Sequence, residues 1–448
     1  MSVRDTLSRL GRDVAHEVVV NVLAAVAVGA MAFVLLGGRI EDLYTRLRPN
    51  APVSGQVALV TIDEEAFYLW NPYDPAPETT PRAMLAEIVR FLQAAGARVV
   101  VLDILTDQPA TGDDALVASV QAHGRVVAAE RFSPGRADDV SPFAPATVLG
   151  EVALPAYANL GLEEQTLFSG QMTVRAVPLV TSVSRARLSG PFPTGLVGGF
   201  QDDESPAPSL ALASAWMQLT TNPPGDLTSA LASRCGGTPV VCTGDAADLG
   251  LPETGVPLHE PLGLNLRGPE GGDGIPSVSA ARLLRSLGES ALARTIGVDL
   301  PITVPADIGE QLKGRVVVVG RVDAGANDQF VTSYSFPAMQ LADMSGARVH
   351  AQLIDTLLTG RHLRRVDGTA AWVGAAVLGL LCLLTGRRAA SLHLLGWGLV
   401  TVALLGGGIA AFRMFDGLVL DVAPALAVLT CALVAVHLYA RAAAPESE

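Results

Sequence analysis

An almost unbroken apolar segment, QVALVTID at residues 56–63, decides the fold class of this chain. Strands covered on both faces are continuous apolar runs, whereas strands with one face in water alternate apolar and polar residues. Three further segments share this character: ARVVVLDI (97–104), RVVAAERF (125–132) and GRVVVVGRV (314–322). The four segments predict buried strands of one sheet.

Helical patterns separate these strands. Thr80-Pro81 begins a stretch with apolar residues at helical spacing that stops at Gly96, and residues 113–123 form a second stretch before Gly124. Residues 346–360 give a third helix after the last strand. Strands that alternate with helices at this spacing indicate parallel crossovers. We therefore expect an α/β domain with a mostly parallel sheet and flanking helices.

The middle of this domain is less regular. We expect a helix over 209–219, a strand over 262–268 and a helix over 277–287. Residues 220–260 are rich in Pro, Gly and Thr and indicate an excursion from the sheet.

The apolar residues are concentrated in a few places. Half of the 448 residues are hydrophobic and only 17% are charged, which is unusual for a soluble enzyme. Four stretches are long enough to cross a bilayer: 18–38, 369–386, 389–412 and 418–440. The first has a rival interpretation as a cleaved signal peptide, because residues 27–30 are small, but an apolar run continues beyond them. We expect four transmembrane helices.

Arginines set the orientation of these helices. Three arginines lie in residues 1–17, and Arg387-Arg388 occupy the link between the second and third spans. Positively charged links stay in the cytoplasm. We therefore expect cytoplasmic tails at 1–17 and 441–448, and an extracytoplasmic domain at 39–367, in a multi-pass protein of a bacterial-type cytoplasmic (inner) membrane.

The charge balance argues against nucleic acid as a partner. The net charge is −13, the isoelectric point is near 5.0, and a single lysine accompanies thirty arginines without any basic cluster. A surface that follows phosphates needs clustered positive charge.

Two of the four cysteines, Cys235 and Cys242, lie in the central domain. An oxidising compartment favours a disulfide between them, and two reduced surface thiols are the alternative. Cys382 and Cys431 lie in apolar spans, and no zinc pattern results.

Motifs for catalysis are absent from the sequence. Gly320 and Gly325 follow a buried strand, but Ala326-Asn327-Asp328 then replaces the Lys-Ser or Lys-Thr of a phosphate loop. No Rossmann glycine pattern, HExxH or Gly-x-Ser-x-Gly occurs. We expect no catalytic residue, no metal site and no cofactor.

Acidic residues follow three of the predicted strands. Asp63, Asp103 and Asp328 come at or after strand ends, where parallel α/β sheets bind their ligands. Each alone is more simply a cap of a turn or a helix. Together they suggest a ligand-binding crevice at one edge of the sheet.

In their order and spacing, these pieces resemble the second type of CHASE domain, a sensory extracellular module associated with cyclases and histidine kinases. The resemblance covers about 40–366 and the three spans that follow. Its carriers are IEDLY (40–44), VTID (60–63), Pro81-Arg82, Leu102-Asp103, DDAL (113–116), VRAVPL (174–179), PSLALASA (208–215), NLRGP (265–269), SVSAARLL (277–284), LKGRVVVVG (312–320), Asn327-Asp328, and Val349-His350-Ala351 with LIDTLLTG (353–360). The segment 331–346 is a loose version of the family's pattern.

The resemblance implies an input module that perceives an unidentified small-molecule or envelope stimulus. Such modules feed a cytoplasmic kinase or cyclase, and no effector follows the last span in this sequence. We therefore expect a non-enzymatic sensor in the lipid bilayer that signals to a separate cytoplasmic or membrane protein, and we leave homodimer formation open. The rival interpretations are a membrane-tethered extracytoplasmic hydrolase and a structural envelope scaffold.

Overall fold

A computed structural model shows how the chain divides into two compact units. One unit comprises residues 49–163 and 172–362, and the other comprises 1–48, 164–171 and 363–448. The structure describes residues 44–45, 52–106, 109–130, 148–150, 152–158, 160–164, 172–182, 206–221, 224–236, 241–252, 256–258, 261–269, 271–295, 300–326, 328–332, 334, 344–366, 368–385, 400, 403–404, 406–420 and 422–442. The predicted tail 1–17 and the predicted span 18–38 lie outside these residues.

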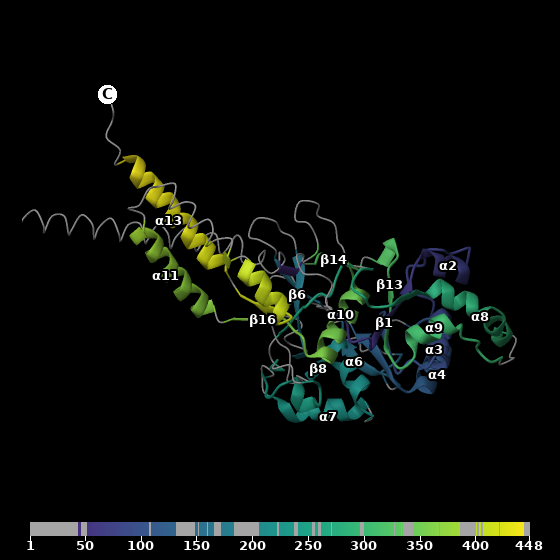
Figure 1. The fold of residues 1–448 in the computed structure, drawn as a ribbon. Coiled ribbons are helices and arrows are strands. Elements are labelled where there is room, and N and C mark those ends of the chain that lie inside the picture. The colour runs from purple at the N-terminus through teal and green to yellow at the C-terminus, as the bar shows by residue number, and fades with distance from the viewer. Residues whose placement is uncertain are drawn as a thin grey trace, which may run out of the picture. The chain divides into compact units, whose positions relative to one another are not determined.

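A six-stranded parallel sheet forms the centre of the first unit (Figure 1). Its order is β12 (Ser277–Ser279), β1 (Val57–Ile62), β13 (Val316–Arg321), β2 (Val99–Asp103), β3 (Val126–Glu130) and β4 (Leu154–Tyr157). The four strands predicted from apolar runs are all present. The predicted fold class, an α/β domain with a mostly parallel sheet, is confirmed.

Helices cover both faces of this sheet. One face of the sheet contains Val60 and the side chains that point the same way on the neighbouring strands. It packs against five helices: α2 (Glu64–Trp70), α3 (Arg82–Ala94), α4 (Asp113–His123), α8 (Ala280–Thr295) and α9 (Ala306–Leu312). Leu59 and its equivalents pack against α6 (Leu210–Leu219), α7 (Pro224–Arg234) and α10 (Gly346–Thr359). Because successive side chains of a strand point to opposite faces, both faces must be apolar, which explains the continuous apolar runs.

The predicted helix boundaries agree with the caps that the structure shows. Pro81 is the N-cap of α3 and Ser209 the N-cap of α6. Gly124 ends α4 with a positive φ of 71°, a conformation that favours glycine. These local signals explain why α4 and α10 match the sequence prediction closely.

Two predicted elements need correction. The helix predicted over 277–287 begins only at Ala280, because residues 277–279 extend the parallel sheet as β12 beside β1. The strand predicted over 262–268 is restricted to β11 (Pro261–Gly263), which pairs with β6 (Met172–Pro178). The residues after Gly263 do not continue the ladder, since they bind α10 instead. The short helix α2 was not predicted.

Smaller elements complete this unit. A three-stranded sheet contains β11, β6 and β5 (Gly161–Glu164), and β7 (Val180–Ser182) pairs with β8 (Pro206–Pro208). The excursion predicted over 220–260 holds α7, β9 (Cys235–Gly236), β10 (Val241–Cys242) and the short helix η1 (Ala246–Leu249). Near the end of the domain lie η2 (Ala324–Ala326), β14 (Gln329–Phe330) and β15 (Met344–Ser345).

The second unit contains the apolar C-terminal helices. Helix α11 (Gly368–Thr385) packs against α13 (Ala423–Ala442) through small residues such as Ala375 and Ala425. Residues 406–414 are also helical, and β16 (Arg364–Arg365) pairs with β17 (Leu418–Val419). Within the described parts of the chain, no helix has the length and apolar character required to cross a membrane.

Candidate functional site

Asp103 occupies the last position of β2, at the carboxyl edge of the sheet. It lies beside Gly320 of β13, to which it is paired in the parallel register. Val101, two residues earlier, faces the layer of α6 and α10, and Asp103 points to the same side. Only 10% of its side chain is exposed. Burial raises the pKa of Asp103 from 3.8 to about 7.

Gly320 allows helix α10 to approach this edge. A Cβ atom at Gly320 would lie closer than 3.0 Å to the Cβ of Ala347, in the first turn of α10. Only a residue without a side chain fits at this point, which is a common reason for glycine within a strand. The first turn of α10 therefore rests directly on the end of β13.

This approach places His350 of α10 close to Asp103. The Nε2 atom of His350 lies 3.9 Å from Oδ1 of Asp103 and 3.1 Å from the carbonyl oxygen of Ala158. The carbonyl can only accept, so Nε2 carries the proton and Nδ1 is the acceptor of the neutral ring. Burial lowers the pKa of His350 to about 4, against the smaller raising effects of Asp328 and the Ala158 carbonyl.

Asp328 contacts the beginning of the same helix. Its carbonyl oxygen accepts a hydrogen bond from the backbone N–H of Gly346 at 2.9 Å. Its carboxylate lies over Gly346, where a Cβ atom would again come closer than 3.0 Å. A negative charge at a helix N-terminus is favourable, because the unpaired N–H groups there are positive. Asp328 and Asp103 are thus both placed around the first turns of α10.

Asp63 has a different role from these two acids. Its Oδ1 accepts from the backbone N–H of Ala66 at 2.9 Å and makes Asp63 the N-cap of α2. Its Oδ2 accepts from the hydroxyl of Ser279 at 2.9 Å. Both carboxylate oxygens of Asp63 are therefore used within the fold, as the capping alternative predicts.

A further polar feature of α10 was not predicted. Four side chains at helical spacing form a row that we call the α10 polar stripe: Arg348, Gln352, Asp355 and Thr359. Arg267, from the segment after β11, binds this row. Its backbone N–H donates to Gln352 at 2.7 Å and its Nη2 to Thr359 at 2.9 Å. Its Nε lies 3.3 Å from Oδ2 of Asp355, with both side chains completely buried.

The α10 polar stripe also reaches two other segments. Arg348 donates to Oδ1 of Asp273 at 2.8 Å, and Gln352 donates to Oδ2 of Asp273 at 3.0 Å. Burial raises the pKa of Asp273, and the nearby Arg348 opposes this shift. Asp355 accepts from the backbone N–H of Ser54 at 2.8 Å. Buried ionic groups are costly without partners, and these contacts hold the middle of α10 against the segments that carry Arg267, Asp273 and Ser54.

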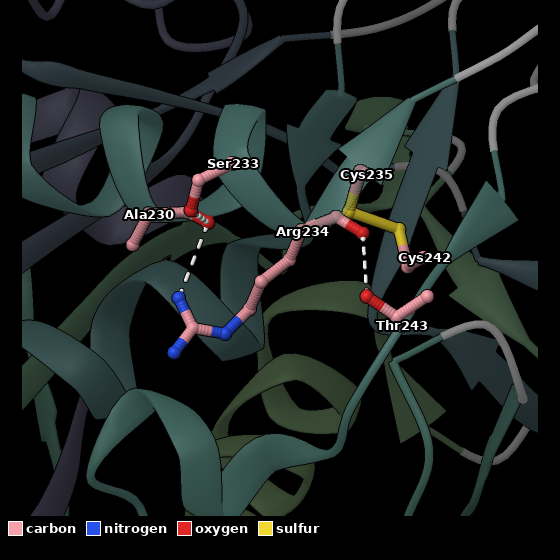
Figure 2. Close-up of a disulfide and its surroundings, with 6 residues drawn as sticks. All are labelled: Ala230, Ser233, Arg234, Cys235, Cys242 and Thr243. Carbon is pink, nitrogen blue, oxygen red and sulfur yellow. Dashed lines mark hydrogen bonds between the residues drawn. A yellow bond between two sulfur atoms is a disulfide. The ribbon is translucent and has the colours of Figure 1, made fainter.

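The two cysteines of the central domain form a disulfide in the structure (Figure 2). Cys235 and Cys242 lie opposite each other in the antiparallel pair of β9 and β10, and both are buried. The Thr243 hydroxyl donates to the carbonyl of Arg234 at 3.2 Å beside this bond. The disulfide lies in the excursion, and none of the contacts described for α10 involves it.

Metal ligation has no support in the described part of the chain. No group of three or more His, Cys, Asp or Glu side chains there is arranged to hold a metal ion. At the N-terminal end of α10, three groups can accept hydrogen bonds: the carboxylates of Asp103 and Asp328 and Nδ1 of the neutral His350. Such a set suits a ligand with N–H or O–H donors.

Comparison with known proteins assigns the chain to a family. A family model described as the CHASE2 domain matches residues 18–402. No curated protein and no solved structure matches the chain significantly. The family match covers the sheet, its helices and α11, and confirms the resemblance seen in the sequence. The chain belongs to the CHASE2 domain family.

Proposed function

We propose that the chain is a membrane-bound extracytoplasmic sensor that perceives its stimulus at the N-terminal end of α10 and signals to a separate protein. The CHASE2 domain is a sensory, extracellular-type domain and not a catalytic one. The acceptor groups of Asp103, Asp328 and His350 support a binding role for this end of the helix.

The main support for the proposal is the set of contacts that helix α10 makes. Its first turns contact the candidate site, and its middle binds the backbone of Ser54 through Asp355. Just beyond its end, the carbonyl of Arg361 accepts a hydrogen bond of 2.6 Å from Asn265. The chain before Ser54 leads to the proposed anchor, and the chain after Arg361 leads to α11. A change at the site therefore has a direct covalent route to both proposed membrane segments.

Apolar side chains on the C-terminal helices support a membrane location. Helix α11 exposes five large apolar residues: Val373, Val377, Leu380, Leu381 and Leu384. Exposed apolar surface of this extent is unusual for a helix in water and suits hydrocarbon. The proposal keeps spans at 18–38, 369–386, 389–412 and 418–440 in the cytoplasmic membrane, with 39–367 outside. The proposal also includes a separate signalling protein that contacts this chain.

Reporter fusions test the location. A fusion at Gly150 should be active only in the extracytoplasmic space, and a fusion after Glu448 only in the cytoplasm, because the arginine-bearing links stay inside. An extracytoplasmic C-terminus would contradict the four-span arrangement.

Purification from native membranes tests the signalling role. A kinase or cyclase should co-purify with the full chain, and its activity in the complex should change in the double variant Asp103→Asn/Asp328→Asn. The matched control is Asp63→Asn, which keeps the cap of α2 because asparagine is an equally good N-cap. Equal partner activity in all three chains would overturn the role of α10 as the sensing element.

A further inference from the structure

Two adjacent side chains at the N-terminal end of α10 each carry a buried polar atom without a hydrogen-bond partner within the described residues. These atoms are Oδ2 of Asp103 and Nδ1 of His350. The His350 side chain is 4% exposed and the Asp103 side chain 10%. Buried polar atoms are nearly always paired in folded proteins, because leaving them unpaired is costly. Two unpaired atoms on adjacent side chains therefore point to a ligand.

The chemistry of these atoms defines the ligand. Nε2 of His350 is committed to the Ala158 carbonyl, so the unpaired Nδ1 is an acceptor. An ionised Asp103 only accepts as well. The charge of Asp328 acts on the same imidazole. These acceptors and the nearby negative charge of Asp328 favour a ligand that offers donors and positive charge.

We propose that this site binds a small primary amine in its ammonium form, and that such an amine is the stimulus of the sensor. An ammonium group offers three N–H donors and no acceptor, which matches the unpaired atoms of Asp103 and His350. The second half of this inference rests on the proposed function, whereas the binding itself does not.

Three other ionisable side chains lie near Asp103 at the carboxyl edge of the sheet, and two of them have partners of their own. Tyr157 at the end of β4 donates its hydroxyl to the Pro178 carbonyl. Arg321 at the end of β13 pairs with Asp323 at 2.7 Å. Glu130 ends β3, between the strands of Asp103 and Tyr157. Arg321 is therefore not the cation that serves Asp103 in the described structure.

Binding of the ammonium displaces a proton. Below pH 7 the Asp103 carboxyl group holds a proton on its oxygen, since burial raises its pKa to about 7. When the ammonium enters, this proton goes to water and an N–H group of the ligand donates to the freed oxygen. Linkage then requires the affinity to rise by up to about tenfold per pH unit until pH 7, and to level off above it.

The amine can act as a signal because α10 forms part of its site. A ligand shifts a protein between two states only through a difference in affinity for them. His350 lies one turn beyond Ala347, which packs on Gly320 without free space. An ammonium that donates to Oδ2 of Asp103 and to Nδ1 of His350 therefore favours the position of α10 that brings both atoms to it.

Thermal unfolding and calorimetric titration of the full chain in lipid nanodiscs test this inference. The probes are methylammonium and 1,4-diaminobutane, and the control is tetramethylammonium, which has the same charge as methylammonium but no N–H donor. We expect the two amines, and not the control, to raise the unfolding temperature, with an affinity that increases from pH 5 to pH 7.

Variants locate the site. Asp103→Asn should weaken amine binding by about tenfold or more, because a hydrogen bond to a charged group is lost. His350→Gln provides a second test if Asp103→Asn does not fold. Asp63→Asn should bind the amines as the natural chain does, because the carboxylate of Asp63 is used within the fold.

Several outcomes would overturn the inference. Equal effects of methylammonium and tetramethylammonium, an affinity that does not change with pH, or undiminished binding in the Asp103 and His350 variants each exclude the amine site. A response to calcium in place of amines would also exclude it. If the chain does not bind amines, the results of the reporter fusions and of the co-purification still stand. If the reporter fusions instead place the domain in the cytoplasm, the proposed extracytoplasmic sensor is wrong, but amine binding by the purified chain is unaffected.

Discussion

Replacing Gly320 by alanine should loosen the contact between β13 and α10. The added Cβ atom would come closer than 3.0 Å to the Cβ of Ala347, and neither atom is at the flexible end of a side chain. Helix α10 must therefore move away from the sheet. The same movement would separate His350 from Asp103, whose nearest polar atoms lie 3.9 Å apart.

The size of this effect follows from two opposing terms. An extra methyl group in a close-packed core costs about 1–3 kcal/mol. Replacing a strand glycine by alanine returns roughly 0.5–1 kcal/mol of backbone entropy. We expect the free energy of unfolding to fall by roughly 1–2 kcal/mol, which corresponds to a loss of roughly 2–3 °C in the unfolding temperature of a domain of this size.

Calorimetry of the full chain in detergent micelles measures this change. The matched control is Gly309→Ala in α9, where the new Cβ atom would meet Val304 at an ordinary 3.5 Å. In a helix this substitution stabilises by up to about 1 kcal/mol, so the two variants should differ in sign. If Gly320→Ala is as stable as the natural chain, the close approach of α10 to β13 does not hold this edge of the sheet.

Three further predictions concern other groups. Asp63→Ala should lower the free energy of unfolding by about 1 kcal/mol through loss of the α2 cap, and Asp63→Asn should not, as measured by urea unfolding. Thiol labelling of the denatured, unreduced chain should miss Cys235 and Cys242, and reduction should cost on the order of 2–3 kcal/mol for so short a loop; labelling at both positions would refute the bond. Burial raises the pKa of Asp103 from 3.8 to about 7, so its contribution to stability is present below pH 4 and lost as the pH rises to 7. Burial lowers the pKa of His350 from 6.5 to about 4, so its contribution is present above pH 6.5 and lost as the pH falls to 4. In urea unfolding between pH 4 and 6.5, the stability of Asp103→Asn should therefore rise with pH and that of His350→Gln should fall, each by at most about 1.4 kcal/mol per pH unit. In the natural chain the two contributions nearly cancel. Parallel pH profiles in the two variants would contradict the assigned pKa shifts.

The sheet was predictable because its strands are buried on both faces. Residues 316–319 are four consecutive valines, and no other common element explains such a run. The three-residue strand β12 was not predictable, since its sequence continues into the apolar pattern of α8. The pairing of a strand that short with β1 is decided by the tertiary structure and not by local preference.

The candidate site was predictable only in part. Asp103 is marked by its position at the end of an apolar run, and this position does place it against α10. His350 has no such mark, because its partners, Asp103 and Ala158, are distant in sequence. Asp63 carried a signal that favours a cap, since two glutamates follow it in the first turn of a helix. Strand-end position alone does not separate a cap from a binding residue.

The order of strands in the sheet has a consequence for how the domain is made. The central strand β13 pairs with β1, although about 250 residues separate them in sequence. At a synthesis rate of about 5–20 residues per second, β1 waits for its partner for roughly 10–50 s after it is made. During this time an apolar strand that ends fully buried is left with an open edge, and contacts of such long range close slowly. The domain therefore completes its core late, and β1 is the segment that most needs protection from aggregation until residue 321 has been added.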